Sequence, residues 1–287
     1  MRTLKWPLQE RVSTSENKYE NKSWTEECQG VANDGCNWYF TQDRRLWKFL
    51  PDKKIYQPIP GEMLRLGYNH MGDLDYYNGK LYVPLEGTSP PRILLYRTEG
   101  TPAPVYLSNA ELTHFTTEGR IEPNTYSPWC AINPLNGLLY TSEFNTRILY
   151  VYSIHITSSE KLILEPLGSF HLFDEVGKDL DMSRVQGGVF SHNTGHLYLV
   201  SDNKDTNEGG IMGFDMITGR RAFHKVVDYD PKAWPEGEEL EGIDIWNTPD
   251  GQIHLIMLQN ENAPGAGGTD DVYFKHYKVE IGAEDFV

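Results

Sequence analysis

Acids, amides and one histidine stand at positions in this sequence where they could carry acid–base chemistry. His70 lies three residues before Asp73, and Glu241 precedes a glycine as Gln29 and Gln186 do. An imidazole titrates near neutrality, and a nearby carboxylate can orient the ring and raise its pKa, so such a pair can exchange a proton with an organic ligand. We therefore predict His70 as a general acid or base oriented by Asp73 or Glu86, and we predict His70, Asp73 and Glu241 as catalytic residues. A structural use of His70, in a loop cap or between two sheets, stays open at this point.

Amide and aromatic side chains near these positions suit ligand binding. Gln29 and Gln186 could donate hydrogen bonds to a carbonyl or hydroxyl group, and Tyr126 and Trp129 could stack on a ligand. We predict these four residues as ligand-binding residues. Packing between neighbouring sheets is the alternative use of the two aromatic rings.

Three further acids suit a metal site. Together with Glu241, the carboxylates of Glu86, Glu143 and Asp202 could surround a hard cation such as Ca²⁺, which prefers oxygen ligands. Solvated acids on the rim of a sheet are the alternative reading of each of them. The sequence thus predicts either no required cofactor or Ca²⁺.

The elements that must position these residues follow a repeat. Five segments share a glycine-containing apolar strand, a turn, an aromatic-rich strand and a third apolar strand. Taking Gly30, Gly72, Pro128, Gly187 and Gly242 as equivalent, the steps are 42, 56, 59 and 55 residues. Such steps fit four-stranded propeller blades with variable outer loops. We predict one all-β domain over residues 1–287, a single five-bladed β-propeller of antiparallel blades; a β-sandwich or two small β domains would need no such period.

Turns and chain ends agree with this architecture. The pairs Asn78-Gly79, Asn136-Gly137 and Asp250-Gly251 predict the first hairpin turn of three blades. The N-terminal stretch is expected to complete the fifth blade, because pairing the two chain ends removes an exposed sheet edge. Residues 171–185 are the main expected exception, a helical turn.

The propeller architecture also predicts where the chemistry lies. Innermost strands start, and second strands end, on one face of the disc around the mouth of the central channel. The first-strand starts carry Gln29, His70, Asp73, Trp129, Gln186, Glu241 and Asp244, and the second-strand ends carry Gln42, Asp43, Glu86, Glu143, Asp202 and Glu261. Polar groups that converge on a concave position are typical of ligand sites.

Some of these phrases resemble known propellers. QGVANDG, GDLDYYNGKLYV and EGIDIW are similar to blade phrases of five- and six-bladed propellers related to the gluconolactonase/regucalcin, strictosidine-synthase-like and YncE-like groups. Residues 73–74, 78–82 and 240–243 are similar to phrases of the five-bladed calcium-activated apyrases. The first resemblance implies small-molecule chemistry at the channel mouth, and the second implies calcium-dependent phosphohydrolysis. Gln29 and Gln186 stand where the gluconolactonase-like group has a metal-binding glutamate, which argues against a metal-dependent lactonase.

The composition of the chain limits the classes of partner that it can bind. The chain of 287 residues has a formal net charge of −15, which repels phosphate backbones and anionic lipid headgroups. We therefore expect a small-molecule ligand and neither nucleic acid nor membrane as partner, with the oligomeric state open. The sequence has no apolar run of the ~20 residues of a membrane helix and no apolar signal segment. A cytoplasmic protein is expected if Met1 is native and a secreted one if the chain is a processed form.

The three cysteines, Cys28, Cys36 and Cys130, lack the spacing of a zinc site or a disulfide framework. A Cys28–Cys36 disulfide stays open.

These observations predict a small-molecule enzyme or ligand binder with an acidic, aromatic site at the channel mouth. Acid–base chemistry on a neutral or cationic organic substrate is expected, with lyase, isomerase, cyclase or hydrolase reactions all open. The alternatives are a calcium-dependent phosphohydrolase and a noncatalytic lectin-like or scaffolding propeller. Lectin propellers repeat one sugar site in every blade, whereas the second-strand ends here differ, which favours a single axial site.

Overall fold

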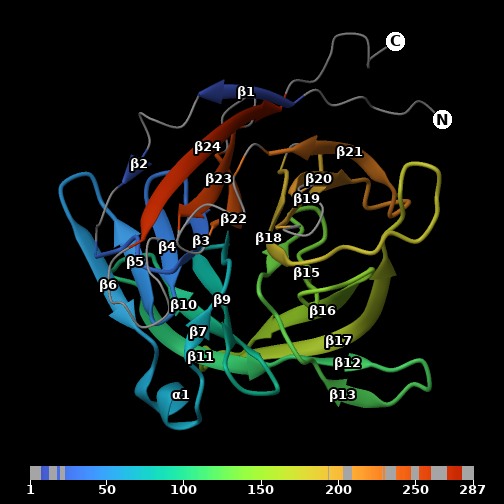
Figure 1. The fold of residues 1–287 in the computed structure, drawn as a ribbon. Helices are drawn as coiled ribbons and strands as arrows, with labels where there is room; N and C mark the ends of the chain where they lie inside the picture. The colour runs from blue at the N-terminus through green and yellow to red at the C-terminus, as the bar shows by residue number, and fades with distance from the viewer. Residues whose placement is uncertain are drawn as a thin grey trace.

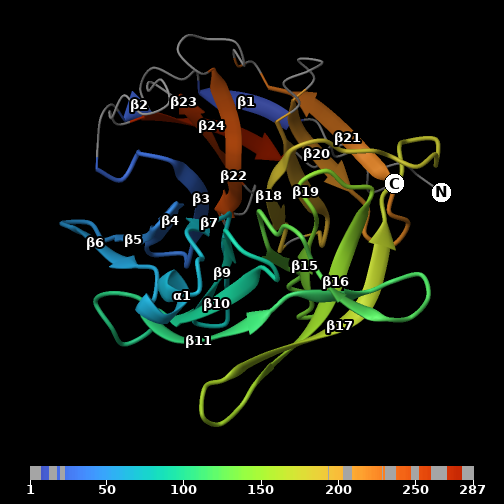
Figure 2. The same ribbon diagram turned by 60° about the horizontal axis from the view of Figure 1, so that its bottom comes forward.

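The computed structural model describes residues 8–12, 18–19, 23–192, 194–202, 209–227, 229, 237–246, 252–259 and 270–279. Its strands pair antiparallel into sheets that surround a common centre (Figures 1 and 2). Strands β3, β18 and β22 face that centre, and β6, β11, β17 and β21 lie at the periphery (Figure 1). The predicted all-β propeller arrangement is confirmed.

Four sheets are built from consecutive strands, in the order inside to outside. The first contains β3 (Cys28–Asn33), β4 (Trp38–Gln42), β5 (Arg45–Phe49) and β6 (Lys54–Pro58). The second contains β7 (His70–Met71) and β8 (Asp75–Tyr77), which both pair with β9 (Lys80–Glu86), then β10 (Arg92–Arg97) and β11 (Val105–Glu111). The third contains β14 (Ala131–Ile132), β15 (Leu139–Thr141), β16 (Ile148–Ile156) and β17 (Leu162–His171). The fourth contains β18 (Val185–Phe190), β19 (Leu197–Ser201), β20 (Gly210–Phe214) and β21 (Arg221–Val226).

The remaining large sheet joins the two ends of the chain. It contains β22 (Glu238–Trp246), β23 (Gln252–Gln259), β24 (Asp271–Val279) and, paired with β24, the N-terminal strands β1 (Leu8–Val12) and β2 (Lys18–Tyr19). The expectation that the N-terminal stretch pairs with the last strand is confirmed. The structure shows four blades of consecutive strands, so the prediction of five blades is not confirmed; the remaining sheet combines strands from both chain ends.

Smaller elements decorate the sheets. A hairpin of β12 (Thr113–Phe115) and β13 (Ile121–Pro123) follows the second sheet, and α1 (Gly61–Arg65) joins the first sheet to the second. No helix that the structure describes is long and apolar enough to cross a membrane. The expected helical turn at residues 171–185 is wrong: isolated bridges there, such as Phe173 with Asp179, tie the segment to itself and to neighbouring strands.

The predicted hairpin turns hold where the structure describes them. Asn78 and Gly79 both have positive φ, at 48° and 76°, and Gly137 has a φ of 70°. These left-handed conformations are the ones that Asn and Gly tolerate best. The turn at Asp250-Gly251 lies outside the described residues.

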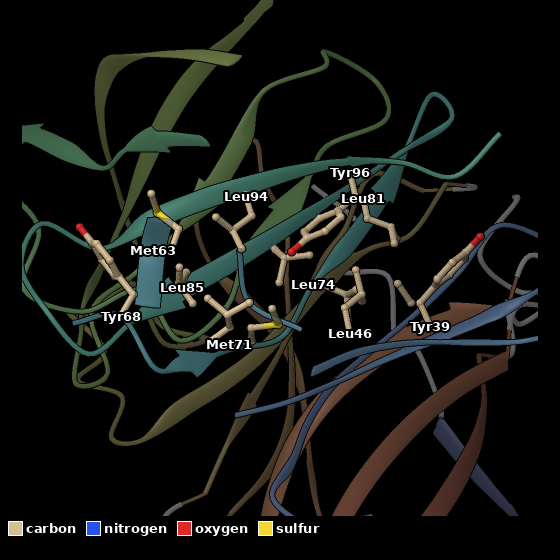
Figure 3. Close-up of a cluster of buried hydrophobic side chains, with 13 residues drawn as sticks. Tyr39, Leu46, Met63, Tyr68, Met71, Leu74, Leu81, Leu85, Leu94 and Tyr96 are labelled. Atoms are coloured by element: carbon tan, nitrogen blue, oxygen red, sulfur yellow. The ribbon is translucent and has the colours of Figure 1, made fainter. Parts of the chain in front are cut away.

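Apolar side chains fill the spaces between neighbouring sheets. Figure 3 shows one such cluster, in which Leu46 of β5 and Leu81 of β9 meet between the first and second sheets and Met63 of α1 covers one end. Burying one leucine side chain contributes roughly 1.5–3 kcal/mol to folding. These clusters fix each blade against the next and therefore hold the strand ends on which polar side chains sit.

At the repeated glycines, the innermost strands approach one another too closely to leave room for a side chain. A Cβ atom on Gly30 would lie 2.6 Å from the Cα atom of Asp73, and one on Gly72 would lie 2.0 Å from the carbonyl oxygen of Pro128. A Cβ atom on Gly242 would lie 2.6 Å from the Cα atom of Gly30. The repeated glycine of the blade phrases is therefore explained by the close packing of the innermost strands.

Asp73 occupies the resulting axis. Its Oδ1 accepts a hydrogen bond from the N–H of Val31 (3.0 Å), and its Oδ2 accepts from the N–H groups of Gly188 (3.1 Å) and Ile243 (3.2 Å). Its main chain also bonds to the third sheet through Pro128 and Cys130. One buried carboxylate thus joins innermost strands of the first, fourth and composite sheets and blocks the centre of the ring.

All three cysteines are free. Cys28 begins β3 and Cys36 follows the opposite end of that strand, so the strand itself separates the two sulfur atoms. The open question of a Cys28–Cys36 disulfide is thereby answered for this structure.

Candidate functional site

His70 lies at one mouth of the ring, at the start of β7. Its Nδ1 lies 2.6 Å from Oδ1 of Asp43, the residue that follows β4. His70 is also paired in register with Glu86 at the end of β9. The side chains of His70 and Asp43 are 35% and 41% exposed, so the pair is open to solvent on one side.

Surrounding acids set the charge of this histidine. Burial alone would lower the pKa of His70, but the hydrogen bond and negative charge of Asp43 and the charges of Glu86 and Glu27 outweigh it and raise the pKa. Because a carboxylate can only accept a hydrogen bond, Nδ1 carries the proton toward Asp43 and Nε2 is left to exchange a proton with a ligand.

The residues before three of the repeated glycines lie at β-bulges, which change the direction of their side chains. The register of the first two strands shifts at Gln29 in β3, at Gln186 in β18 and around Glu241 in β22. A bulge places an extra residue in one strand and re-aims its side chain. The glutamine or glutamate of each phrase is therefore set apart from the regular alternation of its strand.

Glu241 is a deeply buried acid of the mouth, with 2% of the residue exposed. Its Oε1 accepts a hydrogen bond of 2.9 Å from the amide of Gln186. Burial, followed by the charges of Glu239 and Asp202, raises the pKa of Glu241 well above the usual range. Burial therefore favours the protonated form of this side chain, which can donate a proton.

Glu27 adds a further acid to the mouth. The desolvation of its carboxyl group, together with the charges of Asp43, Asp270 and Glu239, raises its pKa to about 7, and His70 acts in the opposite sense. These mutual influences show that acids of the first, second and composite sheets share one region. The sequence offered no signal for Glu27, which precedes β3 outside the repeated phrase.

The three acids predicted as metal ligands are occupied by other partners. Glu86 accepts from the N–H of Ser127, and Glu143 accepts from two successive N–H groups at 2.8 and 2.9 Å. Asp202 is fully buried, and its Oδ2 accepts a hydrogen bond of 3.2 Å from Nε of Arg184. Among the residues that the structure describes, no three His, Cys, Asp or Glu side chains assemble as a metal site. A calcium requirement stays a prediction.

Two other predicted site residues lie away from the solvent. Trp129 is fully buried, donates from Nε1 to Ser142 Oγ at 2.9 Å and packs in the core of the third and fourth sheets, so no ligand reaches its ring. Asp73, predicted as a catalytic residue, is fully buried on the axis and joins the sheets instead. Both placements follow from the close approach of the innermost strands, which brings these residues into the interior.

The remaining predicted residues lie nearer the mouth. Tyr126 is 54% exposed, and its N–H donates to Glu143. Gln29 is 7% exposed at the bulge of β3. The structure thus groups His70, Glu86 and Glu143 on one side of the mouth and Gln186, Glu241 and Asp202 on the other, and it selects Asp43 as the partner of His70.

No known protein-family model and no curated protein matches this sequence. Solved structures with a similar arrangement are propeller proteins. A candidate oxidoreductase (glucose dehydrogenase) of Thermus thermophilus has a TM-score of 0.44 and 12% identity over 96% of this chain and 100% of its own. A candidate 6-phosphogluconolactonase of Bacteroides uniformis has a TM-score of 0.42 and 14% identity over 85% of this chain and 70% of its own. The Dos1 propeller has a TM-score of 0.40 and 14% identity over 84% of this chain and 59% of its own. At these TM-scores and identities the likenesses carry no conclusion about this chain, and the propeller arrangement rests on its own sheet topology.

The buried acids predict how stability depends on pH. Burial raises the pKa of Asp75 to about 7, and the pKa values of Glu241 and His70 are also raised. Groups whose pKa is higher in the folded state stabilise it fully below their unfolded pKa, and this stabilisation is lost as the pH rises through the folded pKa. We expect the melting temperature to fall between pH 5 and pH 8, by on the order of 5 °C, given ~1.4 kcal/mol per pKa unit and ~2–4 °C per kcal/mol.

Scanning calorimetry at both pH values measures this fall. The substitution Asp75→Asn removes one of the groups, so it should make the fall smaller. A melting temperature that is equal or higher at pH 8 would refute this assignment of the buried acids.

Proposed function

We propose that this protein is a small-molecule enzyme that performs acid–base chemistry on a neutral or cationic organic substrate at the mouth that carries His70. The observation that carries the proposal is the 2.6 Å contact between His70 Nδ1 and Asp43 Oδ1 at a solvent-connected position. A histidine held in this way has a fixed tautomer and one nitrogen left for the substrate.

The two sides of the mouth support complementary roles. The raised pKa of His70 favours the imidazolium, from which Nε2 can donate a proton, and the neutral ring can then accept one. The raised pKa of Glu241 provides a second proton donor, held by the amide of Gln186. A pair of groups of this kind can protonate one atom of a substrate while removing a proton from another.

The charge of the mouth supports the substrate class. Its acids, Glu27, Asp43, Glu86, Glu143 and Glu239, outnumber the arginines beside them, Arg44, Arg45 and Arg184, so the mouth disfavours an anionic substrate and leaves neutral or cationic organic molecules. This reasoning ranks the phosphohydrolase alternative below the proposal, because its substrate would carry several negative charges.

The proposed site also depends on how the ring closes. We infer that the composite sheet is a fifth blade between the fourth and the first. Two observations support this: Asn33 of β3 donates to Asp244 of β22 at 2.6 Å, and Asp73 accepts from Ile243 of β22 and Gly188 of β18. Five blades would make the mouth a single axial site to which each innermost strand contributes.

A turnover screen tests the proposal. Neutral and cationic metabolites, with sugar lactones and amino sugars included, are incubated with the protein and followed by mass spectrometry. For a substrate so found, His70→Gln is expected to lower kcat by ~10²–10⁴-fold, the usual contribution of a general acid or base. The melting temperature should change little, because the side chain is partly exposed.

His155→Gln is the matched control. His155 also lies beside a carboxylate, Glu165 at 3.6 Å, but it belongs to the outer part of the third blade. Its substitution should leave kcat unchanged. Equal turnover by the wild type and His70→Gln would refute the proposed role, as would a loss of turnover in both variants.

A further inference from the structure

A second pocket lies at the opposite end of the innermost strands from His70. Its volume is about 560 Å³, within the usual range for small-molecule pockets. Every innermost strand contributes to it, through Asn33 of β3, Asp75 of β8, Ile132 of β14, Phe190 of β18 and Asp244 of β22. This pocket is part of neither the predicted site nor the proposed one.

Asp73 separates the two ends. Its carboxylate bonds to Val31, Gly188 and Ile243, all of which lie between the mouth with His70 and this pocket along their strands. A ligand cannot pass along the axis while these bonds exist. The pocket must therefore be filled from its own side and act independently of the first site.

The polar lining of the pocket is negative. Asp75 and Asp244 belong to different blades, and the negative charge of Asp75 contributes to raising the pKa of Asp244. Asp34 and Glu99 add two further acids, and no lysine or arginine occurs among the described residues that line the pocket. One cation between two carboxylates offsets the electrostatic repulsion between them.

The pocket also has an apolar lining, which sets a second requirement for its ligand. Ile132, Val189 and Phe190 form buried walls, and the rings of Tyr76 and Tyr77 are partly exposed beside them. Aromatic faces attract organic cations, and apolar walls favour a hydrocarbon body. A bare metal ion would leave these walls without a contact, and among the described residues no metal-binding group of side chains occurs.

We infer that this second pocket binds a small organic amine, with its ammonium group between Asp75 and Asp244 and its hydrocarbon body against Phe190 and the tyrosine rings. The ammonium would take the place of a proton, since burial raises the pKa of Asp75 to about 7, and burial together with the charge of Asp75 raises the pKa of Asp244. The hydrogen bonds already made by the two carboxylates, to Ile132 N–H and to Asn33 Nδ2, hold them in place for this contact.

Isothermal titration calorimetry with 2-phenylethylamine and its neutral isostere 2-phenylethanol tests the inference. The amine is expected to bind the wild-type protein at least 10-fold more tightly than the alcohol, because only the amine carries a charge. Asp75→Asn and Asp244→Asn should each weaken binding of the amine at least 10-fold while leaving binding of the alcohol unchanged. The comparison of the two probes on the wild type needs no variant, so it holds even if a variant fails to fold.

Two controls distinguish this site from the first. His70→Gln should leave the affinity for the amine unchanged, and so should Asp181→Asn, since the Asp181 side chain is 73% exposed and paired with Arg147. Equal affinities for amine and alcohol, an affinity unaffected by both carboxylate substitutions, or no binding of the amine at millimolar concentration would each overturn the inference. A loss of binding in His70→Gln would place the amine at the other mouth and would also overturn it.

Discussion

The substitution Asp73→Ala is expected to lower the free energy of unfolding by roughly 3–6 kcal/mol. Three buried N–H groups, of Val31, Gly188 and Ile243, lose their acceptor, and each unsatisfied buried group costs about 1–3 kcal/mol. The loss should reach far beyond one strand, because the three donors belong to different sheets. A loss of this size is a large fraction of the total stability of a typical domain.

Urea unfolding followed by tryptophan fluorescence measures this loss. Asp73→Asn should be milder, since its amide oxygen still accepts hydrogen bonds and only the NH₂ group meets a donor. Asp181→Asn, an exposed aspartate, serves as the control and should stay within ~0.5 kcal/mol of the wild type. If Asp73→Ala unfolded at the same urea concentration as the control, the carboxylate could not be what joins the blades.

A second large effect is expected for Gly242→Ala. The added Cβ would lie 2.5 Å from Asp73 Oδ1, 2.6 Å from the Cα atom of Gly30 and 2.8 Å from the carbonyl oxygen of Gln29. Two of these atoms belong to the main chain of β3, which cannot move without disturbing its own sheet. Overpacking of this kind costs about 1–3 kcal/mol and occasionally more, so we expect a loss at the upper end of that range.

Gly61→Ala is the matched control for this clash. A Cβ on Gly61 would meet only the end of the Arg65 side chain, at 3.7 Å. Thermal unfolding of both variants should therefore show a lower melting temperature for Gly242→Ala alone. Similar melting temperatures would mean that β22 and β3 are not in contact, and the inferred closure of the ring would fail.

The repeat in the sequence predicted the propeller because its glycines mark a physical constraint. Gly30, Gly72, Gly187 and Gly242 stand where innermost strands meet around Asp73, and any side chain there would collide with a neighbouring blade. The residues before three of these glycines, Gln29, Gln186 and Glu241, lie at β-bulges. The same close approach of the strands explains these bulges. Spacing alone could therefore indicate both the architecture and the mouth.

Partner choice within the site could not be predicted from spacing. The sequence offered Asp73 and Glu86 as partners of His70, but in the structure the ring contacts Asp43 of the first blade. Asp73 is close to His70 in sequence, but its carboxylate lies on the axis, where it accepts hydrogen bonds from three N–H groups. Trp129 likewise differs from its prediction because burial behind Gly188 depends on how two sheets pack. The second pocket was missed although Asp75 and Asp244 stand within the repeated phrases. The spacing placed Asp244 at the mouth with His70 and gave Asp75 no role, whereas the strands carry both residues to the opposite end.

The ionisation of His70 is the most direct test of the proposed acid–base site, because it needs no substrate. Two-dimensional NMR of the imidazole protons across pH 4–10 gives its pKa in the wild type and in Asp43→Asn, with His155 as an internal reference. The contact with Asp43 predicts a wild-type pKa above the ordinary value of ~6.5 and a fall in Asp43→Asn. A wild-type pKa at or below the ordinary value, or one unchanged by Asp43→Asn, would contradict the account.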